Sequence, residues 1–415
     1  NEAIDLGIKN SKQLKNSLAK IEEATAALKE ALNNQLPDAK LSASYLWLSS
    51  ANVDMKIKGS GGSGGGGGSV PTISKAGYAI ANASVPVYAG GRIRYGIEAS
   101  RFLEQATRLD ADNDKEEVIQ NTIEAFVNLY KAKASVSLVQ ENLAEAQQRV
   151  KDFSNLEKNG LLARNDLLSA QLQASNFELG LLDAENNWKL ANVSMNILLG
   201  LPEKLELVPD SSMVNESFAV KTLDEYLQTA YTNRKDLAAL DLRKKASESS
   251  IKSAKGDYYP SLAVTGGYIA ADIPELISIT NALNIGVGVS YNIGSLWKTK
   301  AKVQQAEARA KQAAIGEGQL NDNIRLDVNH SYLNFLSSQK KIEVYEKAVE
   351  QAVENYRIVK NKYNNSLETT TDLLDANTKQ LLERMNLIFA KADAVVAYNK
   401  LLQAAGLLEE NTKQQ

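Results

Sequence analysis

Two stretches of similar sequence decide the fold of this chain: NGLLARNDLLSAQ at residues 159–171 and NSLETTTDLLDAN at residues 365–377. They align without a gap, so that Asp166 in the first stretch falls on Asp372 in the second. Similarity between distant segments of one chain is the mark of a repeated structural unit. The chain is therefore predicted to contain two copies of one unit.

Further segments extend the duplication. Residues 9–45 align with residues 232–268, again without a gap, and the register of the first pair carries Gly200 onto Gly406. We expect the first repeat over residues 1–206, a linker in an equatorial region over 207–222, and the second repeat over 223–415.

Each repeat is expected to run helix, two strands, long helix, turn and helix. The expected elements of the first repeat are a helix over 3–35, strands over about 41–57 and 76–88, a long helix over 92–156 and a helix over 165–199. Those of the second repeat are a helix over 223–256, strands over about 261–271 and 283–293, a long helix over 297–363 and a helix over 370–404. Each long helix would be roughly 95 Å long at about 1.5 Å per residue. Helices of this length indicate an extended, coiled-coil-like assembly.

The clearest strand is LNIGVGVSYNI, from Leu283 to Ile293. Apolar or aromatic residues occupy every odd position, and Asn, Gly or Ser occupies every even one. Strict alternation over about ten residues is typical of a transmembrane β-strand, with its apolar side toward lipid. A half-buried strand of a soluble antiparallel sheet gives the same pattern. The alternation alone therefore leaves both interpretations open.

Four strands per chain cannot close a membrane barrel. Eight strands is the usual minimum, and an open edge in lipid leaves backbone groups unpaired. If the strands lie in a membrane, several chains must share one barrel, and three copies would supply twelve strands.

Composition argues against most other functions. Lys and Arg number 47 against 50 Asp and Glu, a net charge of -3 that gives no support to nucleic-acid binding. The chain has one histidine, His330, and no cysteine, so zinc, haem and iron–sulfur sites are not expected. Asp372 and Asp375 could form an acid–base pair, but no partner base accompanies them. We therefore expect no enzyme activity, no catalytic residue, no bound metal and no cofactor.

Two other features of the sequence concern the chain's ends and loops. No apolar run reaches the roughly 18 residues that a membrane helix needs, and Asn1 is expected to be a processed or trimmed start. The segment Gly59–Ser69 is a flexible Gly/Ser linker between the first two strands. It is expected at the tip of an external loop, either as an engineered replacement or as a native low-complexity segment.

The duplicated motif also carries a family resemblance. The segments Asp166–Ala170 and Asp372–Ala376 share the pattern D-L-L-x-A, and each follows a turn residue, Gly160 or Ser366. The repeats end in LLGLP and AAGLL, and VPVYAGGRI joins a strand to a long helix. In their order, spacing and duplication, these motifs resemble the outer membrane efflux protein family, of the TolC type. The resemblance covers essentially the whole chain.

This resemblance implies a homotrimer with a shared 12-stranded β-barrel in the outer membrane and a long α-helical barrel through the periplasm. Such a protein would be the passive exit duct of a tripartite efflux or secretion system, with a gated periplasmic entrance. Its partners would be a periplasmic adaptor (membrane fusion) protein, an inner-membrane transporter and outer membrane lipid. Residues 208–220 and the C-terminal tail would form a belt around the helices. The residues alone also allow a soluble coiled-coil scaffold or tether.

The resemblance assigns roles at the periplasmic entrance. Asp372 and Asp375 match the acids of the pore gate, although a solvated first helix turn explains the same residues. Tyr363 and Asp166 match an entrance latch, whose alternative is an ordinary polar contact between helices. The family's arginine beyond the tyrosine is replaced by Glu368, so the latch here is expected to differ.

The two helix–turn–helix tips are expected to seat the adaptor. Exposed apolar residues are unfavourable unless something covers them. The candidate docking residues are Gly160, Leu161, Ser366 and Leu367. Packing between neighbouring tips is the alternative explanation.

Overall fold

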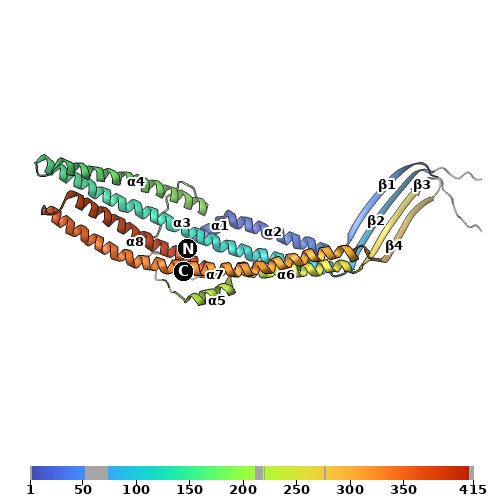
Figure 1. Cartoon of the computed structure of the whole chain (residues 1–415). Helices are drawn as coiled ribbons and strands as arrows, with labels where there is room; N and C mark the ends of the chain where they lie inside the picture. The colour runs from blue at the N-terminus through green and yellow to red at the C-terminus, as the bar shows by residue number, and fades with distance from the viewer. Residues whose placement is uncertain (1, 52–72, 211–217, 219, 275–276, 411–415) are drawn as a thin grey trace, which may run out of the picture. The chain divides into compact units, whose positions relative to one another are not determined.

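The computed structural model describes the whole chain except residues 1, 52–72, 211–217, 219, 275–276 and 411–415 (Figure 1). The predicted linker Gly59–Ser69 and part of the predicted belt lie outside the described residues. The chain forms two units, which we call the helical unit and the sheet unit. The helical unit comprises Asn1–Ile21, Thr107–Leu240 and Gly316–Gln415, and the sheet unit comprises Glu22–Ala106 and Asp241–Ile315.

The sheet unit holds one antiparallel sheet whose strand order is β1-β2-β3-β4. The strands are β1 (Asp38–Ala51), β2 (Ile73–Ala89), β3 (Ser261–Ile273) and β4 (Ile277–Ser290). The four strands predicted from the sequence are thus confirmed. β4 ends before Ile293, where the prediction placed its end, because Asn292 accepts a hydrogen bond from the Gly294 amide (3.0 Å) and turns the chain toward the next helix.

The register of the sheet separates an apolar face from a polar face. Residues paired across strands lie on the same face. One paired row is Leu41, Ala81, Tyr268 and Leu283, and the adjacent row is Lys40, Asn82, Gly267 and Asn284. Along β4 itself, the next residues on the apolar face are Ile285 and Val287, whose exposed fractions are 90% and 70%. The apolar face is therefore open in the single chain.

Short-range contacts fix the passage from strand to helix. Gly90 has φ 62°, and a Cβ there would lie 2.2 Å from the Gly256 carbonyl oxygen, so only glycine fits. Next to it, the Asp257 carboxylate accepts hydrogen bonds from Lys302 and from Arg92 (3.2 Å). Burial raises the pKa of Asp257, but the hydrogen bonds and charges of Lys302 and Arg92 outweigh it and hold the pKa below its ordinary value.

Eight α-helices and one short 3₁₀ turn occur in the described residues. The first-repeat helices are α1 (Glu2–Asn10), α2 (Lys12–Asn33), α3 (Arg92–Lys158) and α4 (Arg164–Leu199). Those of the second are α5 (Leu223–Asn233), α6 (Lys235–Lys255), α7 (Ser295–Asn364) and α8 (Thr370–Ala404), with the 3₁₀ turn η2 (Gly256–Tyr258) after α6. The predicted long helices thus exist, with 67 and 70 residues. None of the described helices is both long and apolar enough to span a membrane.

Two predicted helices are broken, which corrects the expectation of single helices over 3–35 and 223–256. The first break lies at Ser11, whose hydroxyl accepts a hydrogen bond from the Leu14 amide (3.2 Å) and caps α2. The second lies at Arg234, which has extended backbone (φ -63°, ψ 124°). At both breaks a side chain reaches the end of another helix. Asn10 donates to the Leu199 carbonyl (2.6 Å), and Arg234 donates to the Ala404 carbonyl (3.3 Å).

Four helix ends share one turn geometry, in which a left-handed residue follows the helix. The left-handed residues are Gly160, Gly200, Ser366 and Gly406, with φ of 71°, 68°, 60° and 68°. At each tip the next amide reaches back five residues: Leu161 bonds to Leu156 and Leu367 to Lys362, both at 2.9 Å. The two repeats therefore stop their helices in the same way, which supports the internal duplication.

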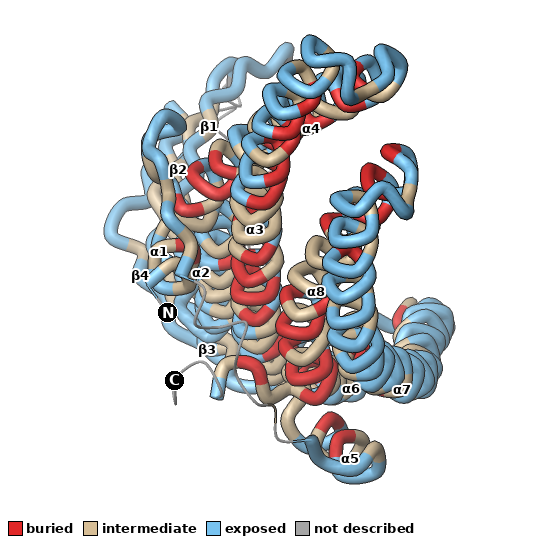
Figure 2. Tube along the Cα trace, turned by 90° about the vertical axis from the view of Figure 1, so that its left-hand side faces the viewer, coloured by how far each residue is buried: buried red, intermediate tan, exposed pale blue. Residues whose placement is uncertain are grey.

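The core of the helical unit combines both repeats. Its largest apolar cluster includes Ile119 of α3, Tyr226 of α5, Phe335 of α7 and Leu401 of α8, each at most 1% exposed. Figure 2 shows buried residues along α3 and α8, whereas α7 is mostly exposed. Of the two long helices, α3 is therefore the more deeply buried, and α7 buries a narrower face.

We predict opposite effects of two substitutions at the helix tips. Gly160→Ala should lower the free energy of unfolding by about 1 kcal/mol, because a side chain is strained in the left-handed region. No atom lies within 4 Å of the added Cβ, so backbone strain is the only effect. Ser366→Gly should raise the free energy by about 0.5 kcal/mol, since glycine relieves that strain but loosens the unfolded chain. Denaturant midpoints at one protein concentration measure both, and a shift of the same sign would contradict the assignment.

Candidate functional site

The two predicted gate acids have different surroundings at the start of α8. Thr369 is the N-cap of the helix, and its hydroxyl accepts a hydrogen bond from the Asp372 amide (3.2 Å). The Asp372 carboxylate in turn accepts from the Thr369 amide (3.3 Å) and from its hydroxyl. This reciprocal arrangement is a capping box. Asp372 therefore stabilises the first turn of α8.

The capping box also fixes the charge of Asp372. The Thr369 hydroxyl, followed by the Thr369 backbone, lowers the pKa of the Asp372 carboxyl because both stabilise its ionised form. Asp375 is exposed on the next turn of α8. Among the described residues, Asp375 takes part in no side-chain hydrogen bond or ion pair. Its carboxylate is thus exposed and free to interact with a group outside this chain.

The first repeat lacks this cap. Its N-cap position holds Ala163, which offers no side-chain hydrogen bond to α4. Asp166 occupies the position of Asp372 but is half-buried, and Ser169 occupies the position of Asp375. The acidic pair therefore belongs to the second repeat only.

The predicted latch residues lie close to one apolar cluster without bonding to each other. Tyr363 stacks on Phe153 with ring centroids 5.7 Å apart, and the cluster around Phe153 includes Leu167, the neighbour of Asp166. Within the described part of this single chain, no hydrogen bond joins Tyr363 to Asp166. Glu368, at the position where the sequence resemblance leads us to expect arginine, pairs with Lys362 (3.0 Å). Apolar contact, rather than a polar latch, brings this region together in the chain.

The two tips present matching apolar side chains. Leu161 and Leu367 follow the left-handed residues of the turns and are 74% and 73% exposed. Because the turn geometry is the same in both repeats, the two leucines occupy equivalent places at the ends of their hairpins. An exposed leucine at each tip is suited to contact with another protein surface.

A buried arginine that the sequence analysis missed connects the two hairpins. Arg149 of α3 is 8% exposed and donates to the Tyr356 hydroxyl of α7 (2.9 Å) and the Asn377 side chain of α8 (3.3 Å). It also donates to Gln173 of α4 (3.2 Å) and to Glu145 on its own helix (3.4 Å). One side chain thus contacts all four helices of the two hairpins.

The Arg149 network is polar, and its central members Arg149, Tyr356 and Asn377 are buried. The Tyr356 hydroxyl donates to Glu145. Burial, followed by the bond to Glu145, raises the pKa of Tyr356 to about 12, so this hydroxyl stays protonated. The sequence did contain a signal, because Arg149 lies three residues after Ala146 and four before Phe153, both buried. A charge at that spacing falls on the apolar stripe of the helix.

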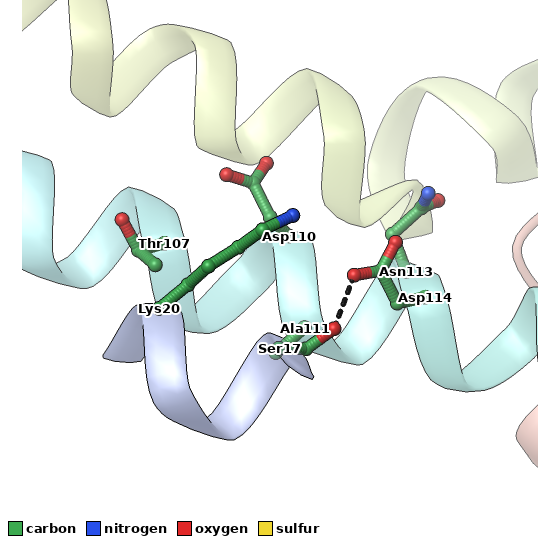
Figure 3. Close-up of a pocket in the computed structure, with 7 residues that line it drawn as sticks. All are labelled: Ser17, Lys20, Thr107, Asp110, Ala111, Asn113 and Asp114. Atoms are coloured by element: carbon green, nitrogen blue, oxygen red, sulfur yellow. Dashed lines mark hydrogen bonds between the residues drawn. The ribbon is translucent and has the colours of Figure 1, made fainter. Parts of the chain in front are cut away.

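A small polar pocket lies between α2 and α3 (Figure 3). Figure 3 shows the Ser17 hydroxyl donating to the Asp114 carboxylate, a bond of 2.5 Å. Thr107 and Asp110 in the same pocket also have partners. The Ser17–Asp114 bond thus joins α2 to α3 across the pocket, and we assign the pocket to helix packing. Among the described residues, no three His, Cys, Asp or Glu side chains gather in a metal-binding group.

The chain is similar to known proteins in both sequence and fold. The sequence model of the outer membrane efflux protein family matches residues 3–201 and 226–407. The outer membrane efflux protein BepC of Brucella suis is 21% identical over 323 residues, which are 77% of this chain and 70% of the relative. The outer membrane protein TolC of Vibrio cholerae is 22% identical over 303 residues, which are 71% of this chain and 68% of the relative.

The fold is likewise similar to a solved structure. The outer membrane protein VceC of Vibrio cholerae superposes with a TM-score of 0.79, covering 98% of this chain and 95% of that chain at 18% sequence identity. At this identity the similarity concerns the fold alone.

We predict that Arg149→Met loosens the contact between the two hairpins. The variant removes the donors that Tyr356, Asn377 and Gln173 share, so local opening of the tips should become easier by about 2–3 kcal/mol. Hydrogen exchange of the Leu161 and Leu367 amides measures this opening. Arg357→Met is the matched control, because Arg357 is exposed and pairs only with Glu354 on its own helix. If the Leu161 and Leu367 amides were equally protected in both variants, the conclusion that Arg149 holds the two hairpins together would be contradicted.

Proposed function

Since this chain belongs to the outer membrane efflux protein family, we propose that three copies of it form one gated exit duct. The chain is an outer-membrane channel protein of the efflux and secretion type, and it extends into the periplasm. The proposal concerns the trimer, the gate and the partners. A homotrimer with a 12-stranded barrel satisfies the backbone of every strand.

The two-faced sheet is the observation that carries this proposal. Its apolar face exposes large side chains in the isolated chain, and its polar face carries Ser, Thr, Asn and Gly. A sheet of this kind is stable where one face meets lipid and the other meets water. The coiled-coil scaffold offers no partner for the apolar face.

The edges of the sheet support more than one copy. In the part of the chain that the structure describes, β1 and β4 each pair with one neighbour, so the outer edge of each strand has no partner there. An unpaired edge is unfavourable in lipid, where each free backbone group costs several kcal/mol. In a trimer, β4 of one copy would pair with β1 of the next.

The helical unit supports the same assembly. Two helices carry rows of exposed apolar side chains. On α4 these are Leu168, Leu172, Leu179, Leu182, Leu190 and Ile197, and on α7 they are Leu326, Leu333, Val344 and Ile358. Rows of this length are unfavourable in water unless another surface covers them. Neighbouring copies of the chain would cover them in a closed ring of helices.

The acids of α8 support a gate at the entrance. In a trimer, each acid would recur three times around the pore axis and form a ring of carboxylates, which favours cations over anions. Asp372 is ionised but engaged in the helix cap, whereas Asp375 is exposed. We therefore assign the larger share of the gate's charge to Asp375. Tyr363 and Asp166 are proposed to stabilise the closed entrance through their shared cluster.

The tips and the repeat boundaries complete the proposal. Gly160, Leu161, Ser366 and Leu367 are proposed to dock a periplasmic adaptor, which links the duct to an inner-membrane transporter. The matching exposure of the two leucines supports equivalent docking at both tips. The repeats are proposed to extend over residues 1–206 and 223–415, joined by residues 207–222.

One experiment tests the trimer and its membrane location. The detergent-solubilised protein should have a mass of three 45.1 kDa chains. Ile285→Lys places a charge on the apolar face and should destabilise the barrel by about 2–4 kcal/mol per chain, so that the trimer is lost. Asn284→Lys places the same charge on the polar face and should leave the trimer intact. A detergent-free monomer, or equal behaviour of the two variants, would favour the scaffold.

A second experiment tests the gate. Asp375→Asn should reduce cation selectivity in planar bilayers on the order of tenfold or less, because one ring of three charges is removed while the helix cap remains. Asp183→Asn is the control, since Asp183 is exposed on α4, away from the helix start. Unchanged selectivity and conductance in Asp375→Asn would remove this residue from the gate.

A further inference from the structure

Glu116 of α3 is a buried carboxylate that no part of the proposed duct explains. The residue is 6% exposed, and among the described residues no side chain or amide forms a hydrogen bond with its carboxylate. Charged groups are seldom buried without a partner, because leaving water is unfavourable for the ionised form. The carboxylate therefore needs either a proton or a nearby positive charge.

Glu116 lies where several parts of the chain meet. Lys115, the preceding residue, forms an ion pair with Glu409 (2.7 Å), just beyond α8. The α5–α6 break contributes Arg234, Lys235 and Asp236, whose charges also act on Glu116. The C-terminal segment from Gly406 to Glu409 is thus held against α3 next to this carboxylate.

The cations near Glu116 already form ion pairs with other carboxylates. Arg234 donates twice to Asp236 (3.1 and 2.7 Å), lies 3.6 Å from Asp327 of α7, and bonds to the Ala404 carbonyl. Lys115 is paired with Glu409. Among the described residues, the charges that act on Glu116 are those of Glu409, Asp236, Lys235 and Arg234, so that three carboxylates, Glu116 included, face two cations.

Burial, followed by repulsion from Glu409, raises the pKa of Glu116 to about 7. Lys235 and Arg234 oppose this effect, and Asp236 adds to it. The carboxyl thus exchanges its proton near neutral pH rather than near its ordinary 4.5.

We propose that Glu116 is a proton-controlled anchor for the C-terminal segment. When it is protonated, the Lys115–Glu409 pair is undisturbed and Leu407–Glu409 stays docked on α3. When it is ionised, it repels Glu409 and competes for Lys115, so the segment detaches more often. The two turns are otherwise alike, since Gly200 lies against Asn10 and Gly406 lies against Asn233.

The direction of the pH effect follows from linkage. Docking keeps the proton on Glu116, whereas detachment returns the carboxyl to water and to an ordinary pKa. The stabilisation is therefore fully present below about pH 4.5, declines as the pH rises toward about 7, and is lost above it. The ceiling of the effect is about tenfold in the docking equilibrium for each pH unit of that interval.

Hydrogen exchange of two equivalent amides tests this inference. The Leu407 amide bonds to the Leu402 carbonyl (2.8 Å), and the Leu201 amide bonds to the Asn196 carbonyl (2.8 Å) in the other repeat. After correction for the intrinsic exchange rate, protection of Leu407 relative to Leu201 should fall at least threefold between about pH 5.5 and 7.5. A ratio independent of pH would overturn the proposal.

Variants separate Glu116 from its neighbours. Glu116→Gln should hold the Leu407 protection high and remove its pH dependence. Glu117→Gln is the control, because Glu117 is exposed and accepts a hydrogen bond from Gln13 instead. A pH response retained in Glu116→Gln, or removed in Glu117→Gln, would assign the response to another group. The wild-type profile decides the question even where a variant does not fold.

Discussion

Backbone pairing in a membrane is the constraint on which the rest of this structure depends. A sheet in lipid has no water to satisfy its free edges, and the described part of this chain forms four strands. The register places apolar side chains such as Leu283 and Ile285 on one face and residues such as Asn284 on the other. A sheet with two such faces and two open edges is the observation behind the proposed barrel, in which neighbouring copies would pair with both edges.

The helical unit meets a related constraint with duplicated parts. Each repeat stops its hairpin with the same left-handed turn, at Gly160 and at Ser366. Near the tips, an apolar cluster that includes Phe153, Leu167 and Leu373 joins the two hairpins, and polar contacts across the repeats add to it. Arg149 supplies such a contact by reaching α4, α7 and α8 from α3. A buried charge with several acceptors is specific in geometry, since each lost partner leaves a polar group unsatisfied.

The differences between the repeats are as informative as their similarity. Thr369 and Asp372 form a capping box at the start of α8, but the equivalent Ala163 gives α4 no cap. Asp375 has Ser169 as its counterpart, so the free acid occurs once per chain. Duplication explains why the two repeats share one architecture. Positions at which the two repeats carry different residues are those at which they differ in function.

Local patterns in the sequence determined much of this fold. Alternation in β4, the length of α3 and α7, and the gapless alignment of residues 159–171 with 365–377 predicted the elements and the duplication. Only the tertiary structure decided the helix breaks at Ser11 and Arg234, the hydrogen bonds of Arg149 to three other helices and the surroundings of Glu116. Each of these depends on a partner more than a hundred residues away, such as Leu199 for Asn10 or Glu409 for Lys115. Periodicity reports which face of an element is apolar, but it holds no information about which distant group will meet a particular side chain.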